Sequence, residues 1–76
     1  MVDAFVMVKT GAGRSESVVA EIRDLEGVSE AHVVAGDYDI MAEITAEEVY
    51  DVLQTASSAI QDLDGVTGTR TYIALD

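Results

Sequence analysis

The residue types that could carry out chemistry are few in this 76-residue sequence. It has no cysteine, which excludes a disulfide, a thiolate zinc site, an iron–sulfur cluster and a cysteine nucleophile. His32 is the single imidazole, and one histidine without a second clustered ligand seldom holds a transition metal. The carboxylates fall mostly on what the spacing predicts to be solvated helix faces, where a catalytic acid or base is not tuned. The sequence therefore predicts no enzyme, no metal site and no cofactor.

Two short segments have the composition of tight turns. Residues 11–14 (Gly-Ala-Gly-Arg) could present N–H groups and a cation to an anion, but they lack the spacing of a P-loop or dinucleotide fingerprint. A plain turn before a helix is the favoured interpretation. Gly36 and Asp37 lie between two alternating segments, and taken alone they predict a two-residue hairpin turn with glycine first.

The charge of the chain is strongly unbalanced, with 15 Asp and Glu against four Lys and Arg and a net charge of −11. This excess repels phosphate backbones and anionic lipid heads, so we expect neither a nucleic acid nor a membrane as a direct partner. No apolar run approaches a membrane span, and no signal peptide is recognisable, so we expect a cytoplasmic protein.

The acidic surface, the single lysine and the Ala- and Val-rich composition resemble proteins of salt-loving organisms. At ~1 M salt the Debye length is about 3 Å, which nearly abolishes the self-repulsion of such a surface. We therefore expect the protein to loosen or dissociate in dilute salt.

The elements that position these residues are repeated once. Residues 22–29 (IRDLEGVS) recur as residues 60–67 (IQDLDGVT), half a chain length later. Period-2 alternation predicts strands over residues 2–9, 28–35, 38–45 and 67–75. Helical spacing predicts a first helix with Ser15 as its N-cap, and a second helix opened by a capping box that begins at Thr45. The apolar stripe predicted for the second helix is Val49, Leu53, Ala56, Ile60 and Leu63.

The resulting order is βαββαβ, which predicts one α+β domain over residues 1–76 with a ferredoxin-like fold. Four antiparallel strands carry two helices on one face, and the first and third strands lie at the centre. The other face is half apolar, which is more than a small monomer usually exposes, so we expect a homodimer formed sheet to sheet and higher assembly beyond it. The residues predicted to line this dimer interface are Phe5, Met7, His32, Val34, Met41, Arg70 and Tyr72.

The segment from Val34 to Ile40 (VAGDYDI), the βαββαβ order and the Gly-Val pairs that follow both helices give the chain a resemblance to a known family. It resembles a stand-alone ligand-binding domain of the Lrp/AsnC family, also called the RAM domain, without the helix-turn-helix of the full-length regulators. The resemblance covers essentially all of the chain. It implies binding of a free amino acid or related effector, assembly into dimers or larger oligomers, and no DNA binding by this chain alone.

The resemblance also implies a site in clefts between dimers, built on the loop between the second and third strands. A carboxylate suits the α-ammonium of an amino acid, and N–H groups and hydroxyls suit its α-carboxylate. The residues implied at this ligand-binding site are Gly36, Asp37, Tyr38, Asp39, Thr69 and Thr71. The alternative is that the loop residues only build the turn, that Asp39 accepts a nearby backbone N–H, and that the threonines are ordinary strand residues.

The leading hypothesis is an effector-binding and oligomerisation module that modulates transcription regulators or senses amino acids. Full-length Lrp/AsnC regulators are candidate partners, because a two-fold interface can accept a homologous surface. Two alternatives stay open: an ACT-like amino-acid sensor, which has the same strand order but pairs side by side, and a small cofactor-free enzyme of the dimeric α+β barrel class.

Overall fold

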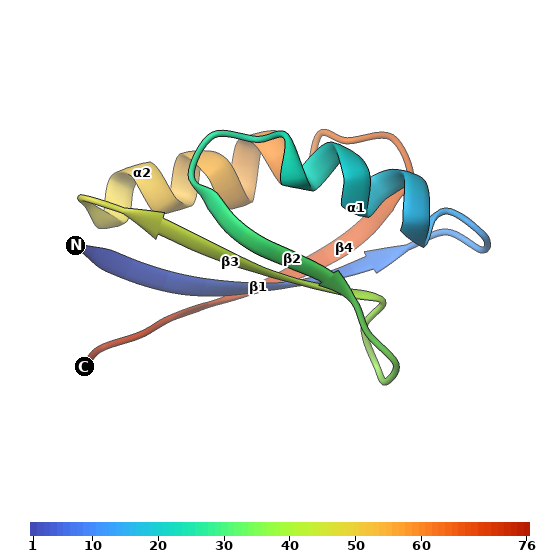
Figure 1. Cartoon of the computed structure of the whole chain (residues 1–76), viewed down its shortest axis with the longest axis horizontal. Helices are drawn as coiled ribbons and strands as arrows, with labels where there is room; N and C mark the ends of the chain where they lie inside the picture. Colours follow the sequence, from blue (N-terminus) through green and yellow to red (C-terminus); the bar gives the residue numbers. More distant parts are fainter.

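The computed structural model describes the backbone of residues 1–76 and all side chains except that of Ser57. The elements in chain order are β1 (Val2–Thr10), α1 (Ser15–Arg23), β2 (Val28–Val33), β3 (Ile40–Ala46), α2 (Val49–Leu53), the π-helix η1 (Gln54–Ile60) and β4 (Val66–Ile73). The strands form one antiparallel sheet in the order β2-β3-β1-β4, and the helices lie on one face of it (Figure 1). The predicted α+β, ferredoxin-like architecture is confirmed, with β1 and β3 at the centre.

The core lies between the helices and one face of the sheet. Alternate residues of β1 and β3 are buried there, because successive side chains of a strand point to opposite faces. The fully or almost fully buried residues are Ala4, Val6, Val8, Val18, Val19, Ile22, Ala31, Ile40, Ala42, Ile44, Val52, Ala56 and Ile60. Their neighbours in the strands therefore lie on the opposite face, which no helix covers and which we call the open face (Figure 1).

The buried stripe of the second helical segment differs from the prediction. Val49 and Leu53 are 46% and 43% exposed, whereas Val52 is fully buried. The chain passes from α2 directly into the π-helix η1, where Ala56 and Ile60 are buried as predicted. The predicted phase of this helix was wrong at its first turn.

Neither predicted helix cap is present. Arg14 precedes α1 without a side-chain cap, and the Ser15 hydroxyl instead contacts the Thr10 hydroxyl at 2.9 Å. Thr45 is held in β3, where its hydroxyl donates to an Asp3 carboxylate oxygen at 3.0 Å, and α2 begins only after Glu48. In both places the hydroxyl that the sequence assigned to a helix cap forms a hydrogen bond with a residue of β1 instead.

The connection between β2 and β3 is longer than the predicted two-residue turn. The strands end at Val33 and resume at Ile40, and the Val34 N–H donates to the Asp39 carbonyl at 2.9 Å. Residues 34–39 form a loop that projects away from the helices (Figure 1). Gly36 adopts a φ of 152° within this loop, a conformation that favours glycine.

Candidate functional site

The loop of residues 34–39 contains four of the six residues implied at the ligand site, and Asp39 anchors it. The Asp39 N–H donates to the Val8 carbonyl, and its carboxylate Oδ2 accepts the Thr10 N–H, both at 2.9 Å. This contact lies where the pairing of β1 with β4 shifts register, between Lys9 and Thr10. The expected alternative role of Asp39 as a backbone acceptor is therefore confirmed. Within the described residues its second oxygen, Oδ1, has no hydrogen-bond partner.

Tyr38 connects the same loop to the open face. Its side chain is half-buried, and the Lys9 ammonium lies 5.6 Å from the centre of its ring, within range of a cation–π attraction. Interaction with the Tyr72 hydroxyl, and secondarily the charges of Tyr38 and Tyr72, raise the pKa of Arg70 above its ordinary value. Tyr72 follows the exposed Arg70 by two residues on β4, so their side chains lie on the same face of the sheet. Asp37 is exposed in the loop, between Gly36 and Tyr38 in the sequence.

The other two residues implied at the ligand site, Thr69 and Thr71, lie on the edge strand β4. They pair with Val8 and Val6, whose side chains are buried under the helices, so the threonines face the helix side of the sheet. Asp39 bonds to β1 on the side that faces β3, whereas β4 lies on the opposite side of β1. Strand β1 therefore lies between Thr69 and the loop. One chain therefore does not bring the loop and the two threonines together into a single pocket.

Thr69 lines a shallow polar cavity of ≈ 260 Å³ at the free edge of β4. The Gln61 amide donates to the Thr69 hydroxyl at 2.9 Å, and Val66, Thr67 and Gly68 complete the lining. Cavities that enclose small ligands measure about 300–1,000 Å³, so this one supplies only part of a site. Sequence reasoning did not single out Gln61. The available signal was the repeat, in which Gln61 occupies the place of Arg23.

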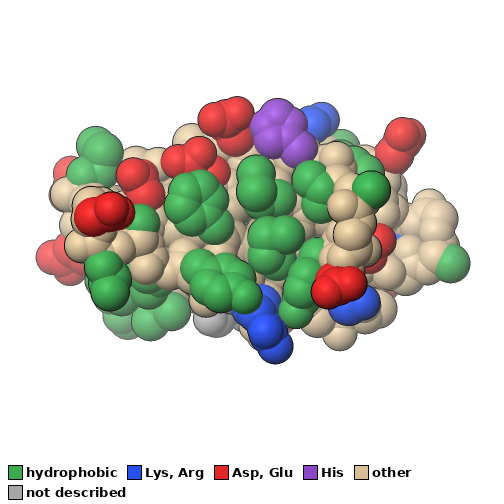
Figure 2. Space-filling model, turned by 90° about the horizontal axis from the view of Figure 1, so that it is seen from below, with side chains coloured by type: hydrophobic (Ala, Val, Ile, Leu, Met, Phe, Trp, Pro, Cys, Tyr) green, Lys and Arg blue, Asp and Glu red, His purple; other side chains and the backbone are tan. Residues whose placement is uncertain are grey.

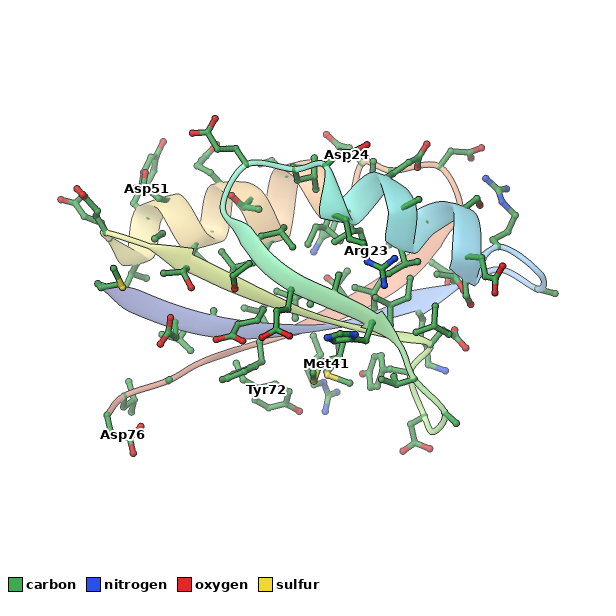
Figure 3. The ribbon with its side chains drawn as sticks, viewed as in Figure 1. Arg23, Asp24, Met41, Asp51, Tyr72 and Asp76 are labelled. Carbon is green, nitrogen blue, oxygen red and sulfur yellow. The ribbon has the colours of Figure 1, made fainter. Side chains whose placement is uncertain are left out.

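An equivalent cavity of ≈ 230 Å³ lies at the other edge of the sheet, next to β2. Here Arg23 points from α1 toward the strand, and its Nε donates to the Ala31 carbonyl at 3.0 Å (Figure 3). Ala31 is the repeat counterpart of Thr69. The arginine thus covers a backbone acceptor of edge strand β2, which protects that edge from pairing with another strand. At β4 the glutamine reaches the threonine side chain instead.

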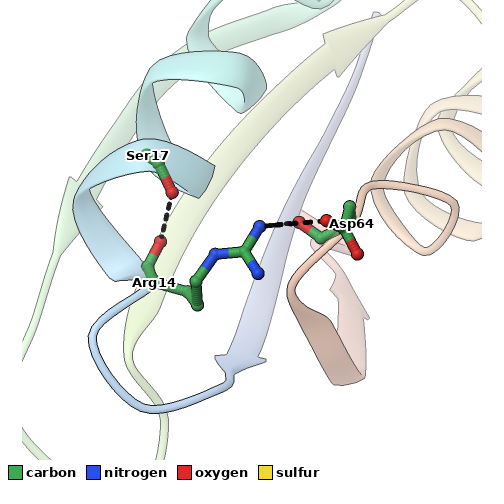
Figure 4. Close-up of polar contacts among 3 residues, drawn as sticks. All are labelled: Arg14, Ser17 and Asp64. Carbon is green, nitrogen blue, oxygen red and sulfur yellow. Dashed lines mark hydrogen bonds and ion pairs between the residues drawn. The ribbon is translucent and has the colours of Figure 1, made fainter.

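The residues that precede α1 do not form an anion site. Arg14 contacts Asp64, with its guanidinium 3.2 Å from a carboxylate oxygen, and its own carbonyl accepts the Ser17 hydroxyl at 3.0 Å (Figure 4). The Gly11 N–H donates to the Gly65 carbonyl at 2.9 Å. The segment therefore fastens the start of α1 to the turn before β4, as expected for a structural turn.

Other acidic and imidazole groups do not form a metal centre. A surface cavity of ≈ 320 Å³ beside α2 is lined by Glu26, Glu47 and Asp51 among other residues. His32 contacts Glu30 at 3.2 Å, with both side chains more than half exposed. Among the residues that the structure describes, no group of three His, Asp or Glu side chains is placed to hold a metal ion.

The open face carries six of the seven residues predicted for a dimer interface, and the seventh, Val34, lies in the loop that follows β2. In the sheet register, Met7 is flanked by Met41 and Arg70, and His32 continues this row on β2. A second row contains Glu30, Glu43, Phe5 and Tyr72. Met41 and Tyr72 project below the sheet, away from the helices (Figure 3). Seen from below, apolar side chains form a continuous patch across the middle of this face (Figure 2).

Sequence comparison connects the chain to a family of regulators. A family model described as the Lrp/AsnC ligand binding domain matches residues 3–76. The chain is 31% identical over 72 residues to the HTH-type transcriptional regulator FL11 of Pyrococcus abyssi, and 30% identical over 61 residues to the leucine-responsive regulatory protein of Haemophilus influenzae. These matches cover 95% and 80% of this chain but 47% and 37% of the relatives. The chain thus spans about half or less of the length of these curated relatives.

Solved structures share the whole fold. TTHA0845 from Thermus thermophilus matches with a TM-score of 0.95 at 29% identity, over 100% of this chain and 95% of that chain. FFRP-DM1 matches with a TM-score of 0.92 at 31% identity, over 99% and 100%. AsnC of E. coli matches with a TM-score of 0.89 at 25% identity, over 99% of this chain and 51% of that chain. Within the described part of the chain, no helix is long and apolar enough to cross a membrane.

Proposed function

Because this chain belongs to the Lrp/AsnC family and corresponds to its ligand-binding domain, we propose that it binds a small effector, in the first place a free amino acid, and assembles into dimers and larger oligomers. The family match favours this hypothesis over an ACT-like sensor. A transcriptional regulator of the same fold, NMB0573 from Neisseria meningitidis, has a crystal structure as a complex with L-Met, at 16% identity and a TM-score of 0.84.

The observation that carries the proposal is the loop of residues 34–39 with Asp39 at its base. One carboxylate oxygen of Asp39 bonds the Thr10 N–H, which fixes the side chain, while Oδ1 has no hydrogen-bond partner among the described residues. A fixed carboxylate with an available oxygen suits an α-ammonium group. The exposed backbone of Gly36 and Asp37 offers N–H groups that suit an α-carboxylate.

The remaining wall of the site comes from a second subunit. The cavity beside Thr69 is shallow and lies across β1 from the loop, so one chain supplies two separated parts of a site. Subunits that bring the loop of one chain to the β4 edge of another would close them around a ligand. In this arrangement effector binding and assembly favour each other, since the ligand binds only the assembled form.

The dimer forms through the open face. Phe5 and Tyr72 are 37% and 53% exposed there and lie side by side in the register. Burial of this apolar patch against a second copy removes it from water, and a chain this small gains from such burial because its own core is limited. The proposed interface residues are Phe5, Met7, His32, Val34, Met41, Arg70 and Tyr72.

The module acts in the cytoplasm on transcription through other proteins. Its net charge of −11 opposes direct contact with DNA, so full-length Lrp/AsnC regulators are the proposed route to a promoter. The curated relatives described above are named as regulators, and we assign the chain no catalytic role.

Calorimetric titration of the twenty amino acids into the assembled protein tests this function, with two variants of Asp39 in parallel. Asp39→Ala removes both carboxylate oxygens and should abolish effector binding while the dimer persists. Asp39→Asn keeps an acceptor for the Thr10 N–H but removes the charge, so it separates ligand binding from anchoring of the loop. Normal binding by both variants would show that the site lies elsewhere.

A further inference from the structure

The four basic residues of the chain divide into two pairs with different surroundings. Arg14 bonds Asp64, and Arg23 bonds a carbonyl of edge strand β2. Lys9 and Arg70 are exposed, and within the described part of the chain neither forms an ion pair with a carboxylate. The chain has 15 acidic residues, so two cations without a carboxylate partner suggest a counter-charge from a ligand.

These two cations are neighbours on the open face. In the register of β1 with β4, Lys9 pairs with Gly68 and Met7 pairs with Arg70, so Lys9 and Arg70 are diagonal neighbours whose side chains point away from the helices. Such neighbours lie about 7–8 Å apart, which is within reach of two long side chains. Seen from below, basic side chains lie at the border of the apolar patch (Figure 2). Two like charges this close repel each other, so an anion between them would stabilise the arrangement.

Gly68 leaves an open space beside both cations. It lies directly opposite Lys9 and carries no side chain, and a Cβ at this position would have no heavy atom within 4 Å. The space is bordered by the ammonium across the strand pair and by the guanidinium two residues further along β4. Both groups present only N–H donors, and glycine allows a ligand to approach the backbone closely. We call Lys9, Gly68 and Arg70 the cationic notch.

The cationic notch adjoins the loop that contains Asp39. The Lys9 ammonium lies 5.6 Å from the centre of the Tyr38 ring, and Tyr38 precedes Asp39 in the loop. The two neighbours of Lys9 in β1 also hold Asp39, because the Val8 carbonyl accepts its N–H and the Thr10 N–H donates to its carboxylate, both at 2.9 Å. The same end of β1 therefore carries an available carboxylate oxygen and a cation without a carboxylate partner.

From this arrangement we infer that the effector is an amino acid with an acidic side chain, aspartate or glutamate, and that its side-chain carboxylate binds in the cationic notch. The inference rests on the proposed function and names the class of its effector. Asp39 and the N–H groups of the loop match the α-ammonium and the α-carboxylate, which leaves the two cations for one further anionic group. A carboxylate accepts two parallel hydrogen bonds from a guanidinium, whereas a neutral side chain would leave both cations without a counter-charge.

The net charge of −11 does not oppose this contact at short range. Repulsion by the acidic surface acts over a distance and is screened by salt, with a Debye length of about 3 Å at ~1 M. The carboxylates of the strands on the open face belong to Asp3, Glu30 and Glu43, and Glu43 pairs with Phe5. Phe5 is four residues from Lys9 along β1, or about 13 Å, so these carboxylates lie well away from the Lys9 end of the notch.

Calorimetric titration at one fixed KCl concentration tests the inference with matched ligands. Glutamate and aspartate should bind at least ~10-fold more tightly than glutamine and asparagine, which have nearly the same shape but no side-chain charge. Glutarate carries two carboxylates without an α-ammonium, so it should bind more weakly than glutamate.

Variants of the notch locate the contact. Lys9→Met and Arg70→Met each remove one cation and should weaken glutamate binding at least ~10-fold. Gly68→Val fills the open space and should do the same without loss of the fold, since a β-branched residue suits a strand. Arg14→Met changes the net charge equally at an exposed ion pair outside the notch and should leave the glutamate affinity unchanged. Because Arg70 is also a proposed interface residue, sedimentation of each variant checks its assembly, and the Lys9 and Gly68 variants decide the result if Arg70→Met dissociates.

The possible results separate this inference from the proposed function. Equal affinities for glutamate and glutamine would overturn the inference, and so would glutamate binding that Lys9→Met and Gly68→Val leave unchanged. A neutral amino acid that binds more tightly than glutamate, with its binding lost in Asp39→Ala, would overturn the inference and uphold the proposed function. Glutarate binding as tight as that of glutamate would contradict the proposed role of Asp39, and its loss in Lys9→Met would still support a carboxylate in the cationic notch.

Discussion

The substitution Phe5→Glu tests whether the chain dimerises through the apolar centre of the open face. Phe5 is 37% exposed in the single chain, so this fraction of its surface remains to be buried by a partner. For an aromatic side chain of ~200 Å² that is ~75 Å², worth ~2 kcal/mol at ~25 cal/mol per Å². A two-fold interface contains the residue twice, so the variant loses ~4 kcal/mol of association free energy, or about three orders of magnitude in Kd.

The new carboxylate adds to this loss. In the register, residue 5 lies directly opposite Glu43, and Glu30 is the next residue of the same row. A third carboxylate would stay hydrated in the monomer but would be buried without a partner in the dimer, which costs a further amount of order 1–3 kcal/mol per site. The estimate of about a thousand-fold weaker association is therefore a lower bound.

Sedimentation equilibrium over a concentration series, at fixed molar KCl, measures the effect. Tyr50→Glu is the matched control, because Tyr50 is 66% exposed on α2, on the other side of the molecule, and should tolerate the change without loss of mass. Phe5→Leu keeps an apolar contact and should remain dimeric. A Phe5→Glu variant whose Kd stays within ~10-fold of the wild type would refute an interface centred on the open face.

Three further predictions concern the fold. Ile44→Ala, at a fully buried site, should lower the free energy of unfolding in urea by ~2–5 kcal/mol, and a loss below ~1 kcal/mol would contradict the assigned core. Gly65→Ala should lower the free energy of unfolding by ~1–3 kcal/mol, because φ at Gly65 is +98° and a Cβ there would lie 3.1 Å from Val18 and 3.2 Å from Arg14. Gly68→Ala is the control, because a Cβ at Gly68 would meet open space. Thermal melting of the wild type should shift upward between dilute and molar KCl, and identical curves would exclude a role for screening of the acidic surface.

The sheet was predictable because its patterns are local and repeated. One face of β1 and β3 is buried, so the alternation of Val6 and Val8 with Phe5 and Met7 already assigns each side chain to a face. The repeat of residues 22–29 as 60–67 then implies two similar halves and hence a symmetrical strand order. These features do not depend on distant contacts.

The helix starts and the hairpin were not predictable, because they depend on contacts between residues that are distant in sequence or on the local backbone conformation. The hydroxyl of Thr45 bonds Asp3, which is distant in sequence, and this contact keeps the residue in β3 rather than at a helix cap. In α2 the buried residue is Val52 rather than Val49 or Leu53, and the spacing of apolar residues does not distinguish these three positions. The closure of the loop depends on Val34 and Asp39, outside the two residues that the turn signal identified.

The ligand site was predictable only in part. Resemblance placed Asp39 in it, but the bond from the Thr10 N–H to its carboxylate, which holds the side chain in place, depends on the shift in register of β1. The part that Gln61 plays in the cavity at the β4 edge follows only from its hydrogen bond to Thr69, which the structure provides. In the proposed site, the relation between that edge and the loop is set by a second subunit, whose position the sequence of one chain does not encode directly.

We propose that the chain functions as an assembly that responds to a small effector. The most direct test of this proposal is the mass of the wild-type protein by light scattering in molar KCl, with and without a mixture of the twenty amino acids. We expect a dimer or larger multiple of the 8.1 kDa chain, and a change in the distribution of masses when the amino acids are present. A single 8.1 kDa species under both conditions would contradict it.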